Sequence, residues 1–340
     1  MDRLTCLVPT HRRPAFLRRL LRFYRECPPG FGFVVVDSSD DESAAENARV
    51  IAEAVAGGLL VEHRRLALDF VGKLAVALPE VRTPFVMLCA DDDVLFPDAC
   101  HKGVDFLEQN PGYVSAQGRT AQLYPGRKRF ACMRLKGFDV DDDDPFVRCQ
   151  RLADSFFSNF YSVYRRETLA ENFRLTAAAT DSRLSYTMPE MLLSQLSLIR
   201  GRVKVLPAMH LLMERHPTNA GYLGRTGERP QAEAMYRRFK ECLVGELVRA
   251  GVAAEAADRH VDAAFGYFRE TSLKHRARAR TPGAKAAHLV RSLVERVEDA
   301  FQCDRARHRR LIRAGDLAGS EGAWQCAVGL MREFPDGMPG

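Results

Sequence analysis

The chain has 340 residues, of which 46% are hydrophobic and 28% charged, and its formal net charge is +6. Its length allows a sizeable buried core, either in one large domain with an appendage or in two domains. The small net charge argues against nucleic-acid binding, and no apolar stretch approaches the roughly 18 residues that suggest a membrane span. Nine cysteines without a C-x-x-C pair argue against a disulfide framework and against a zinc site. Because Met1 leads directly into a predicted strand instead of a signal peptide, we expect a cytoplasmic protein.

Strand and helix patterns alternate through the first part of the chain. Apolar runs predict strands at 4–10, 31–37, 59–63 and 84–90, and helical spacing predicts helices at 14–24, 44–56 and 70–78. Such alternation builds a parallel sheet covered by helices, with ligands bound beyond the carboxyl ends of the strands. Thr10, Asp37 and residues 91–93 all fall at such ends, so we expect them to share one site.

Three successive carboxylates, Asp91, Asp92 and Asp93, follow directly behind the fourth predicted strand. Carboxylates are hard oxygen ligands suited to Mg²⁺ or Mn²⁺, and such an ion can hold the phosphates of a nucleotide and neutralise a departing diphosphate. The alternative is that this acidic turn only caps the helix that follows, since Asp favours N-caps and first turns. Because other strand ends supply polar residues to the same edge, we favour a shared ligand site.

The middle of the chain offers a second acidic run and an aromatic run. Residues 113–135 carry strand patterns, and Asp139–Asp144 precede a helix predicted to start near Pro145. No buried strand precedes this acidic run, so we interpret it as a solvent loop with capping aspartates and not as a metal site. The aromatic residues of 156–164 could stack on sugar rings, although core packing is the usual role of such a run.

Beyond about residue 225 the pattern is helical. Helix-like spacing occurs at 231–250, 253–272, 284–302 and 304–314. Two basic clusters, 274–280 and 305–310, could contact an anionic membrane surface peripherally or bind an acidic partner. Acidic residues are spread through the same region, which favours the alternative of solvated helix faces with local ion pairs.

Four segments in the same order resemble the signatures of the family 2 glycosyltransferases with the GT-A fold, in particular a bacterial branch of family 2-like proteins. They are Val8–Pro14 (VPTHRRP), Val34–Asp40 (VVVDSSD), Leu88–Val94 (LCADDDV, similar to a DXD motif) and Ser185–Pro207. The resemblance covers about residues 3–220. It implies an α/β, Rossmann-like GT-A domain at 1–225, with a mostly parallel central sheet flanked by helices, and a helical C-terminal region at 226–340.

The resemblance implies how the donor nucleotide is held. The position of Asp37 contacts the nucleobase in the family, and the strand end at Pro9 and Thr10 lines the nucleotide pocket. Asp91 and Asp92 resemble the acidic pair that handles the ribose and the diphosphate, and Asp91 is also a candidate metal ligand.

The resemblance also implies a metal ligand, a base and further phosphate contacts. Asp93 resembles the position bound directly to the metal, and Glu190 stands where the family keeps its catalytic base, usually Asp. A glutamate can remove the same proton because its intrinsic pKa is similar, although a first-turn helix residue favoured by the macrodipole is the alternative. Arg215 and His216 resemble the element that closes over the diphosphate, with His216 as a candidate metal ligand. Lys73 is a candidate phosphate contact, and a solvated helix face is the alternative.

The implied reaction is direct displacement, with inversion, at the anomeric carbon of a UDP-, GDP- or dTDP-sugar. The acceptor would be a hydroxyl of a saccharide, a lipid-linked molecule or a protein, with Glu190 as base and Mn²⁺ or Mg²⁺ stabilising the leaving diphosphate. A sugar nucleotidyltransferase is one alternative, but residues 10–14 lack the glycine-rich phosphate loop that it needs. A non-catalytic protein that binds a nucleotide sugar or a glycan is another, because Pro189-Glu190 departs from the family's pattern.

Overall fold

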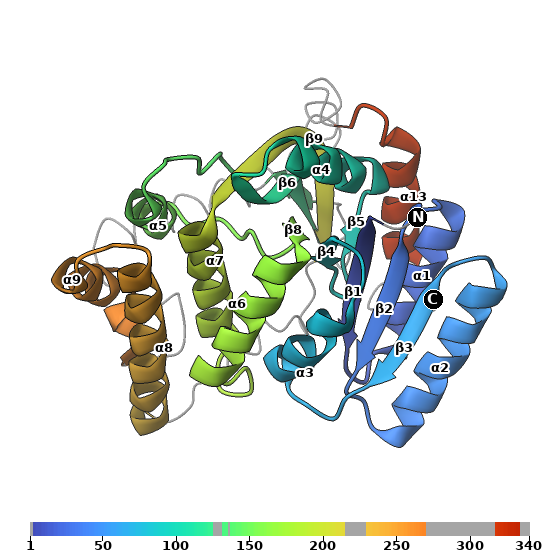
Figure 1. Ribbon diagram of the computed structural model, residues 1–340. Coiled ribbons are helices and arrows are strands. Elements are labelled where there is room, and N and C mark those ends of the chain that lie inside the picture. Colours follow the sequence, from blue (N-terminus) through green and yellow to red (C-terminus); the bar gives the residue numbers. More distant parts are fainter. Residues whose placement is uncertain (1–2, 125–130, 135–136, 215–228, 270–316, 334–340) are drawn as a thin grey trace.

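The computed structural model describes residues 3–124, 131–134, 137–214, 229–269 and 317–333 (Figure 1). Its strands are β1 (Leu4–Thr10), β2 (Gly32–Asp37), β3 (Val61–Arg65), β4 (Phe85–Leu88), β5 (Val94–Leu95), β6 (Tyr113–Tyr124), β7 (Ala131–Arg134), β8 (Val163–Arg165) and β9 (Arg202–Glu214). They form one nine-stranded sheet in the order β3-β2-β1-β4-β8-β6-β9-β5, with β7 paired to β6. The predicted α/β class is confirmed.

The first half of the sheet is parallel, as the alternating pattern predicts. β1 pairs in parallel with β2 and β4, and β2 with β3. The helices between these strands are α1 (Pro14–Glu26), α2 (Asp41–Ala56) and α3 (Phe70–Ala77), followed by the short η1 (Leu78–Glu80). The bounds agree closely with the prediction, and β3 lies two residues later than the predicted 59–63.

Both faces of this half are buried, which explains its continuous apolar strands. Leu4, Cys6 and Val8 of β1 pack against α1, α2 and α4 (Pro97–Gln109) on one face. Leu7, between them, faces α3 and α6 (Arg166–Ala179) on the other. Polar side chains of the sheet therefore gather where the strands end.

The second half of the sheet is mixed. β8 is antiparallel to β4 and β6, β6 is parallel to β9, and β5 is antiparallel to β9. β6 and β9 approach so closely at a register shift that a Cβ on Gly118 would lie 2.2 Å from the carbonyl oxygen of Ala208. The predicted strands within 113–135 are confirmed by β6 and β7.

The second acidic run is a loop, as predicted. Asp144 caps α5 (Pro145–Asp154) by accepting a hydrogen bond from the Phe146 backbone N–H at 2.7 Å, and Asp139 pairs with Lys204. The segment that resembles the family downstream forms α7 (Thr187–Arg200), which ends at Gly201 before β9.

The C-terminal part of the chain is helical where it is described. Its helices are α8 (Arg229–Arg249), α9 (Ala254–Phe265), the short η2 (Gly266–Arg269) and α13 (Glu321–Glu333). α8 and α9 share a core with α5 and α7, whereas α13 returns to the start of the chain and packs on α1 (Figure 1). The predicted helices 284–302 and 304–314 lie outside the described residues, and the pattern analysis did not predict α13.

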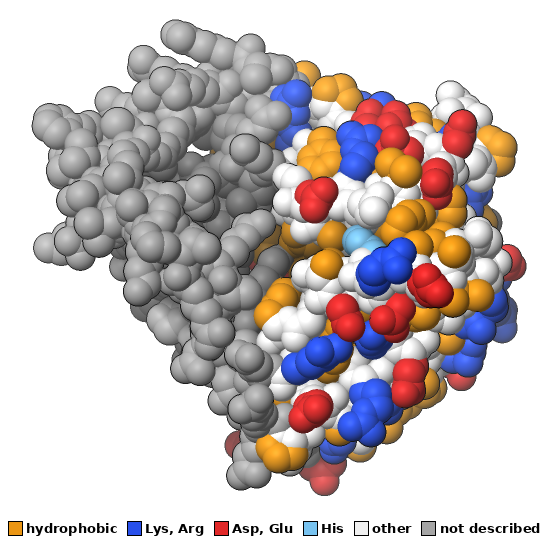
Figure 2. Space-filling model, turned by 90° about the vertical axis from the view of Figure 1, so that its left-hand side faces the viewer, with side chains coloured by type: hydrophobic (Ala, Val, Ile, Leu, Met, Phe, Trp, Pro, Cys, Tyr) orange, Lys and Arg blue, Asp and Glu red, His pale blue; other side chains and the backbone are white. Residues whose placement is uncertain are grey.

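Both basic clusters also lie outside the described residues. On the face formed by α5, α8 and α9, acidic and basic side chains stand side by side and no single sign of charge dominates (Figure 2). None of the helices in the described ranges is long and apolar enough to cross a membrane.

Candidate active site

The carboxyl ends of β1, β2 and β4 meet at one edge of the sheet, which we call the rim and define by Thr10, Asp37 and the triplet Asp91–Asp93. Thr10 lies opposite Asp37 in the register of β1 and β2. Its hydroxyl Oγ1 donates to Oδ2 of Asp91 at 2.8 Å, although 81 residues separate the two in sequence. The structure therefore brings together the strand-end residues that the sequence singles out, with Pro9 next to Thr10 in β1.

Asp37 is a buried hydrogen-bond acceptor, with 1% of its surface exposed. It accepts from the Ser39 backbone N–H at 2.8 Å and from Nδ2 of Asn47 at 2.9 Å, and Nε2 of His63 lies 3.1 Å from its Oδ2. Burial alone would raise the pKa of Asp37, but the bonds from His63, Ser39 and Asn47 outweigh it and lower this pKa well below its usual range. Asp37 is therefore ionised throughout the physiological pH range.

Arg13 joins the rim from the start of α1, and the pattern analysis missed it. Its Nη1 and Nη2 lie 2.8 Å from Oδ1 of Asp91 and 2.8 Å from Oδ2 of Asp92. The guanidinium also lies 4.3 Å from the ring centroid of Phe16. Burial raises the pKa of Asp91 to about 6 against the opposing effect of Arg13.

Asp93 points away from its two neighbours. Its Oδ2 accepts a hydrogen bond from the Tyr161 hydroxyl at 2.6 Å, and its Oδ1 accepts one from the Glu214 backbone N–H at 2.9 Å. Arg19 pairs with the Glu214 carboxylate and donates to the Asp92 carbonyl oxygen. These bonds fasten the end of β9 to the triplet.

Arg215 and His216, the next two residues of the chain, lie outside the described residues. Their predicted positions over the diphosphate stay predictions. The attachment of Glu214 means, however, that the chain leaves β9 from a point in direct contact with Asp93.

Lys73 is buried beneath the rim, with 2% of its surface exposed, so the alternative of a solvated helix face is wrong. Its Nζ donates to the Thr10 carbonyl oxygen at 2.7 Å and to Ser38 Oγ at 3.1 Å. Burial lowers the pKa of Lys73 to about 8, although Asp91 and Asp37 oppose this shift. The periodic pattern of the sequence did not predict that Lys73 is buried, because the burial depends on α6, which covers the outer side of α3.

Glu190 lies half-buried in the first turn of α7. The loop before this helix is tied to the N-terminus of α3, since Ser182 donates to Asp69 through both its backbone N–H and its hydroxyl. Phe70 packs against Tyr186 and against Phe160, the neighbour of Tyr161. A row of aromatic rings thus connects the start of α7 with the residue that contacts Asp93, and none of the hydrogen bonds described above joins the Glu190 carboxylate to the triplet.

The donor atoms of the triplet fit a hard divalent ion, because they are three buried carboxylates. As arranged, the described residues contain no cluster of three or more metal-ligating side chains. Asp91 and Asp92 face Arg13, and Asp93 faces Tyr161. An ion at Asp91 would therefore have to take the place of the Arg13 guanidinium.

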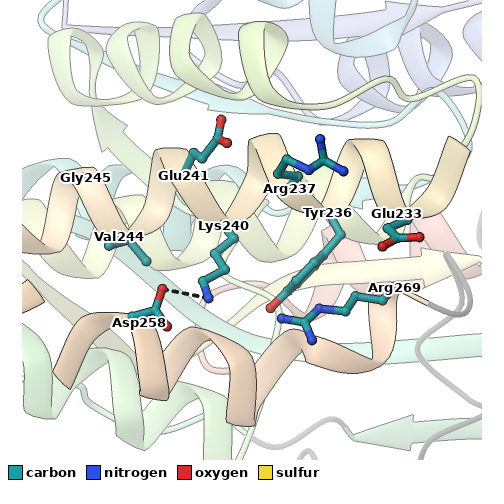
Figure 3. Close-up of a pocket in the computed structure, with 9 residues that line it drawn as sticks. All are labelled: Glu233, Tyr236, Arg237, Lys240, Glu241, Val244, Gly245, Asp258 and Arg269. Atoms are coloured by element: carbon teal, nitrogen blue, oxygen red, sulfur yellow. Dashed lines mark ion pairs between the residues drawn. The ribbon is translucent and has the colours of Figure 1, made fainter. Parts of the chain in front are cut away.

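A groove of about 640 Å³ lies elsewhere, against α8, α9 and η2 (Figure 3). None of the predicted site residues lines it. Among its lining residues, Lys240 pairs with Asp258 at 2.7 Å, and Arg269 lies over the Tyr236 ring. We therefore place the candidate active site at the rim.

The rim lies within a recognisable family domain. The family model described as glycosyl transferase family 2 matches residues 5–173, from β1 into α6. This part of the chain belongs to glycosyl transferase family 2. This family match agrees with the signatures of β1, β2 and the triplet.

Two solved structures with TM-scores above 0.5 agree with the GT-A fold of this chain. TarS of S. aureus is 15% identical with a TM-score of 0.51, over 77% of this chain and 42% of TarS. Its 1–349 segment is 16% identical with a TM-score of 0.53, over 78% of this chain and 73% of that one. The chain thus spans less than half of full TarS. A mannosyltransferase of Pyrobaculum calidifontis, PcManGT, solved with GDP-Man and Mn²⁺, is 15% identical with a TM-score of 0.44, over 94% and 88% of the two chains. No curated protein matches the chain.

Proposed function

We propose that this family 2 glycosyltransferase moves the sugar of a nucleotide-diphospho-sugar to an acceptor hydroxyl with inversion, at the rim and with the help of a divalent metal ion. The observation that carries the proposal is the convergence of Thr10, Asp37 and the triplet at the ends of three parallel strands. Ligands of open α/β sheets bind at this edge.

Asp37 would recognise the nucleobase. Its low pKa keeps it ionised and therefore an acceptor for base N–H groups, and His63 and Asn47 hold its carboxylate in place. Pro9 and Thr10 would line the same pocket, and Lys73 would contribute indirectly, because its ammonium holds the Thr10 carbonyl oxygen from below.

Asp93 and Asp91, with His216, would hold the metal ion, Mn²⁺ or Mg²⁺. When bound, the ion supplies positive charge that stabilises the departing diphosphate. Asp92 and Arg215 would contact the ribose and the phosphates. Tyr161 orients Asp93 through a 2.6 Å hydrogen bond.

Glu190 would act as the base. Its carboxylate takes the proton of the acceptor hydroxyl as that oxygen attacks the anomeric carbon, and the electron pair of the broken bond leaves with the diphosphate. A single displacement of this kind inverts the anomeric configuration. The exposed ring of Tyr186, beside Phe70, offers a stacking surface for an acceptor saccharide, whether free, lipid-linked or attached to a protein.

The test of catalysis is a Glu190→Gln variant. We expect donor binding to stay within about twofold of the wild type while turnover falls by at least about 100-fold, because the amide cannot accept the proton. Glu167→Gln is the matched control, since Glu167 is an exposed glutamate in the first turn of α6. If Glu190→Gln turns over as fast as the wild type, the base is another residue. If the wild type binds a donor but shows no turnover, the non-catalytic alternative is favoured.

A further inference from the structure

Arg13 is the cation that contacts the side chains of Asp91 and Asp92 from the open side of the rim. Its two terminal nitrogens lie 2.8 Å from one oxygen of each carboxylate. The Arg13 side chain is 25% exposed, whereas those of Asp91 and Asp92 are 2% and 6% exposed. The guanidinium thus lies between two buried carboxylates and the space from which a ligand would arrive.

Two other cations, Arg19 and Lys73, lie near the triplet and bond to other groups as well. Arg19 is buried against Glu214 and the Asp92 carbonyl oxygen, and Lys73 holds the Thr10 carbonyl oxygen. Arg13 contacts both carboxylates directly and provides a counter-charge that this pair shares.

A divalent ion and a guanidinium cannot use the same carboxylate oxygens at once, because like charges repel strongly in a buried site. An ion that binds Asp91 must displace Arg13. The displaced guanidinium matches phosphate groups well, since its planar fork forms paired hydrogen bonds with them. A nucleoside diphosphate that arrives with the ion would supply these groups.

We propose that Arg13 is a positioning residue that couples donor binding to metal binding. Without a nucleotide it holds Asp91 and Asp92 and opposes the ion; with a nucleotide it transfers to the diphosphate and leaves the carboxylates to the ion. This inference rests on the proposed function. Because binding linkage is reciprocal, each ligand strengthens the other by the same factor. The alternative is that Arg13 only fastens α1 to the triplet.

The test is a set of equilibrium titrations of Mn²⁺, followed by electron paramagnetic resonance of the free ion, with and without saturating nucleoside diphosphate. UDP, GDP and dTDP are each used as the probe. In the Arg13→Met variant we expect Mn²⁺ alone to bind about tenfold tighter than in the wild type, and the coupling factor between ion and nucleotide to fall about tenfold. Arg13→Lys keeps the charge, but an ammonium group cannot bridge two carboxylates as a guanidinium does. We therefore expect its Mn²⁺ affinity and its coupling factor to lie between those of the wild type and of Arg13→Met.

Arg18→Met is the matched control. Arg18 lies in α1, five residues after Arg13, and its ion pairs with Glu46 and Glu53 are exposed, so Mn²⁺ binding should equal that of the wild type. The inference is overturned if Arg13→Met binds Mn²⁺ alone no more tightly than the wild type, or if Mn²⁺ alone binds to neither protein. If no nucleotide binds to the wild type, the proposed function fails, and the Mn²⁺ titration by itself still decides whether Arg13 competes with the ion.

Discussion

Single residues at the rim depend on partners that are distant in sequence. Thr10, Asp37 and Asp91 could be placed together from sequence because each lies at the end of a strand of a parallel sheet or just after it. Arg13 and Tyr161 could not. Arg13 stands three residues from Thr10 in the chain, but its role depends on contacts with carboxylates 78 and 79 residues away. Tyr161 lies in an aromatic run whose usual role is core packing, and only the tertiary structure shows its contact with Asp93.

Lys73 gives a prediction about pH. Its pKa falls from 10.5 to about 8 on folding, so the unfolded chain binds more protons between those pH values. The free energy of unfolding of the wild type should therefore rise relative to Lys73→Met as the pH increases from about 8 to about 10. Urea denaturation of both proteins across this range measures the difference. Lys102→Met, an exposed control paired with Asp98, should show little pH dependence. If the difference in the free energy of unfolding between the wild type and Lys73→Met does not change with pH, the lowered pKa of Lys73 is contradicted.

Tyr161 gives a prediction about stability. Tyr161→Phe removes the hydroxyl that donates to Asp93 at 2.6 Å and leaves a buried carboxylate short of one donor. We expect the free energy of unfolding to fall by about 1.5–3 kcal/mol, the range for hydrogen bonds to charged groups. Chemical denaturation measures it, with Tyr186→Phe as an exposed control. A change equal to that of the control would mean that this bond does not stabilise the fold.

At the level of elements, the sequence predicted the parallel half of the sheet better than the mixed half. β1, β2 and β4 are covered on both faces, so their apolar runs are unmistakable. β5 and β8 have two and three residues, too few for any periodic pattern. Their antiparallel pairings arise from contacts with β9, β4 and β6, which are set by the tertiary structure.

Gly118 tests the close approach of β6 and β9. A Cβ there would lie 2.2 Å from the Ala208 carbonyl oxygen and 2.9 Å from the His210 Cβ, so the backbone would have to move. Gly118→Ala should lower the free energy of unfolding by at least about 1–3 kcal/mol. Gly329→Ala in α13 is the control: it meets open space and should be neutral or slightly stabilising. Denaturation curves that are the same for Gly118→Ala and the wild type would contradict the register.

At the scale of the whole molecule, α13 near the end of the chain packs against α1 near its beginning. Trp324 of α13 is 1% exposed and stacks on Phe96, with ring centroids 5.9 Å apart. Phe96 precedes α4 and follows the triplet by three residues. The pattern analysis placed the C-terminal region in a separate helical part, because spacing alone does not show that α13 returns to α1.

Trp324→Ala should therefore lower the free energy of unfolding by about 3–5 kcal/mol, the usual cost of removing a buried tryptophan side chain. Thermal and urea denaturation of the full chain measure the change. A loss below about 1 kcal/mol would mean that α13 contributes little to the core next to the triplet.

The central claim, that the rim binds a nucleotide sugar with a metal ion at Asp93, is tested most directly by a thermal-shift panel. UDP-, GDP-, CMP- and dTDP-sugars are each added with and without Mn²⁺ to the wild type, to Asp93→Ala and to Asp141→Ala, a control in the exposed acidic loop. A ligand that binds only the folded protein raises its apparent stability. We predict stabilisation by one nucleotide class, dependent on Mn²⁺, present in Asp141→Ala and lost in Asp93→Ala. Stabilisation by none of these sugars, or stabilisation that survives in Asp93→Ala, would contradict the account.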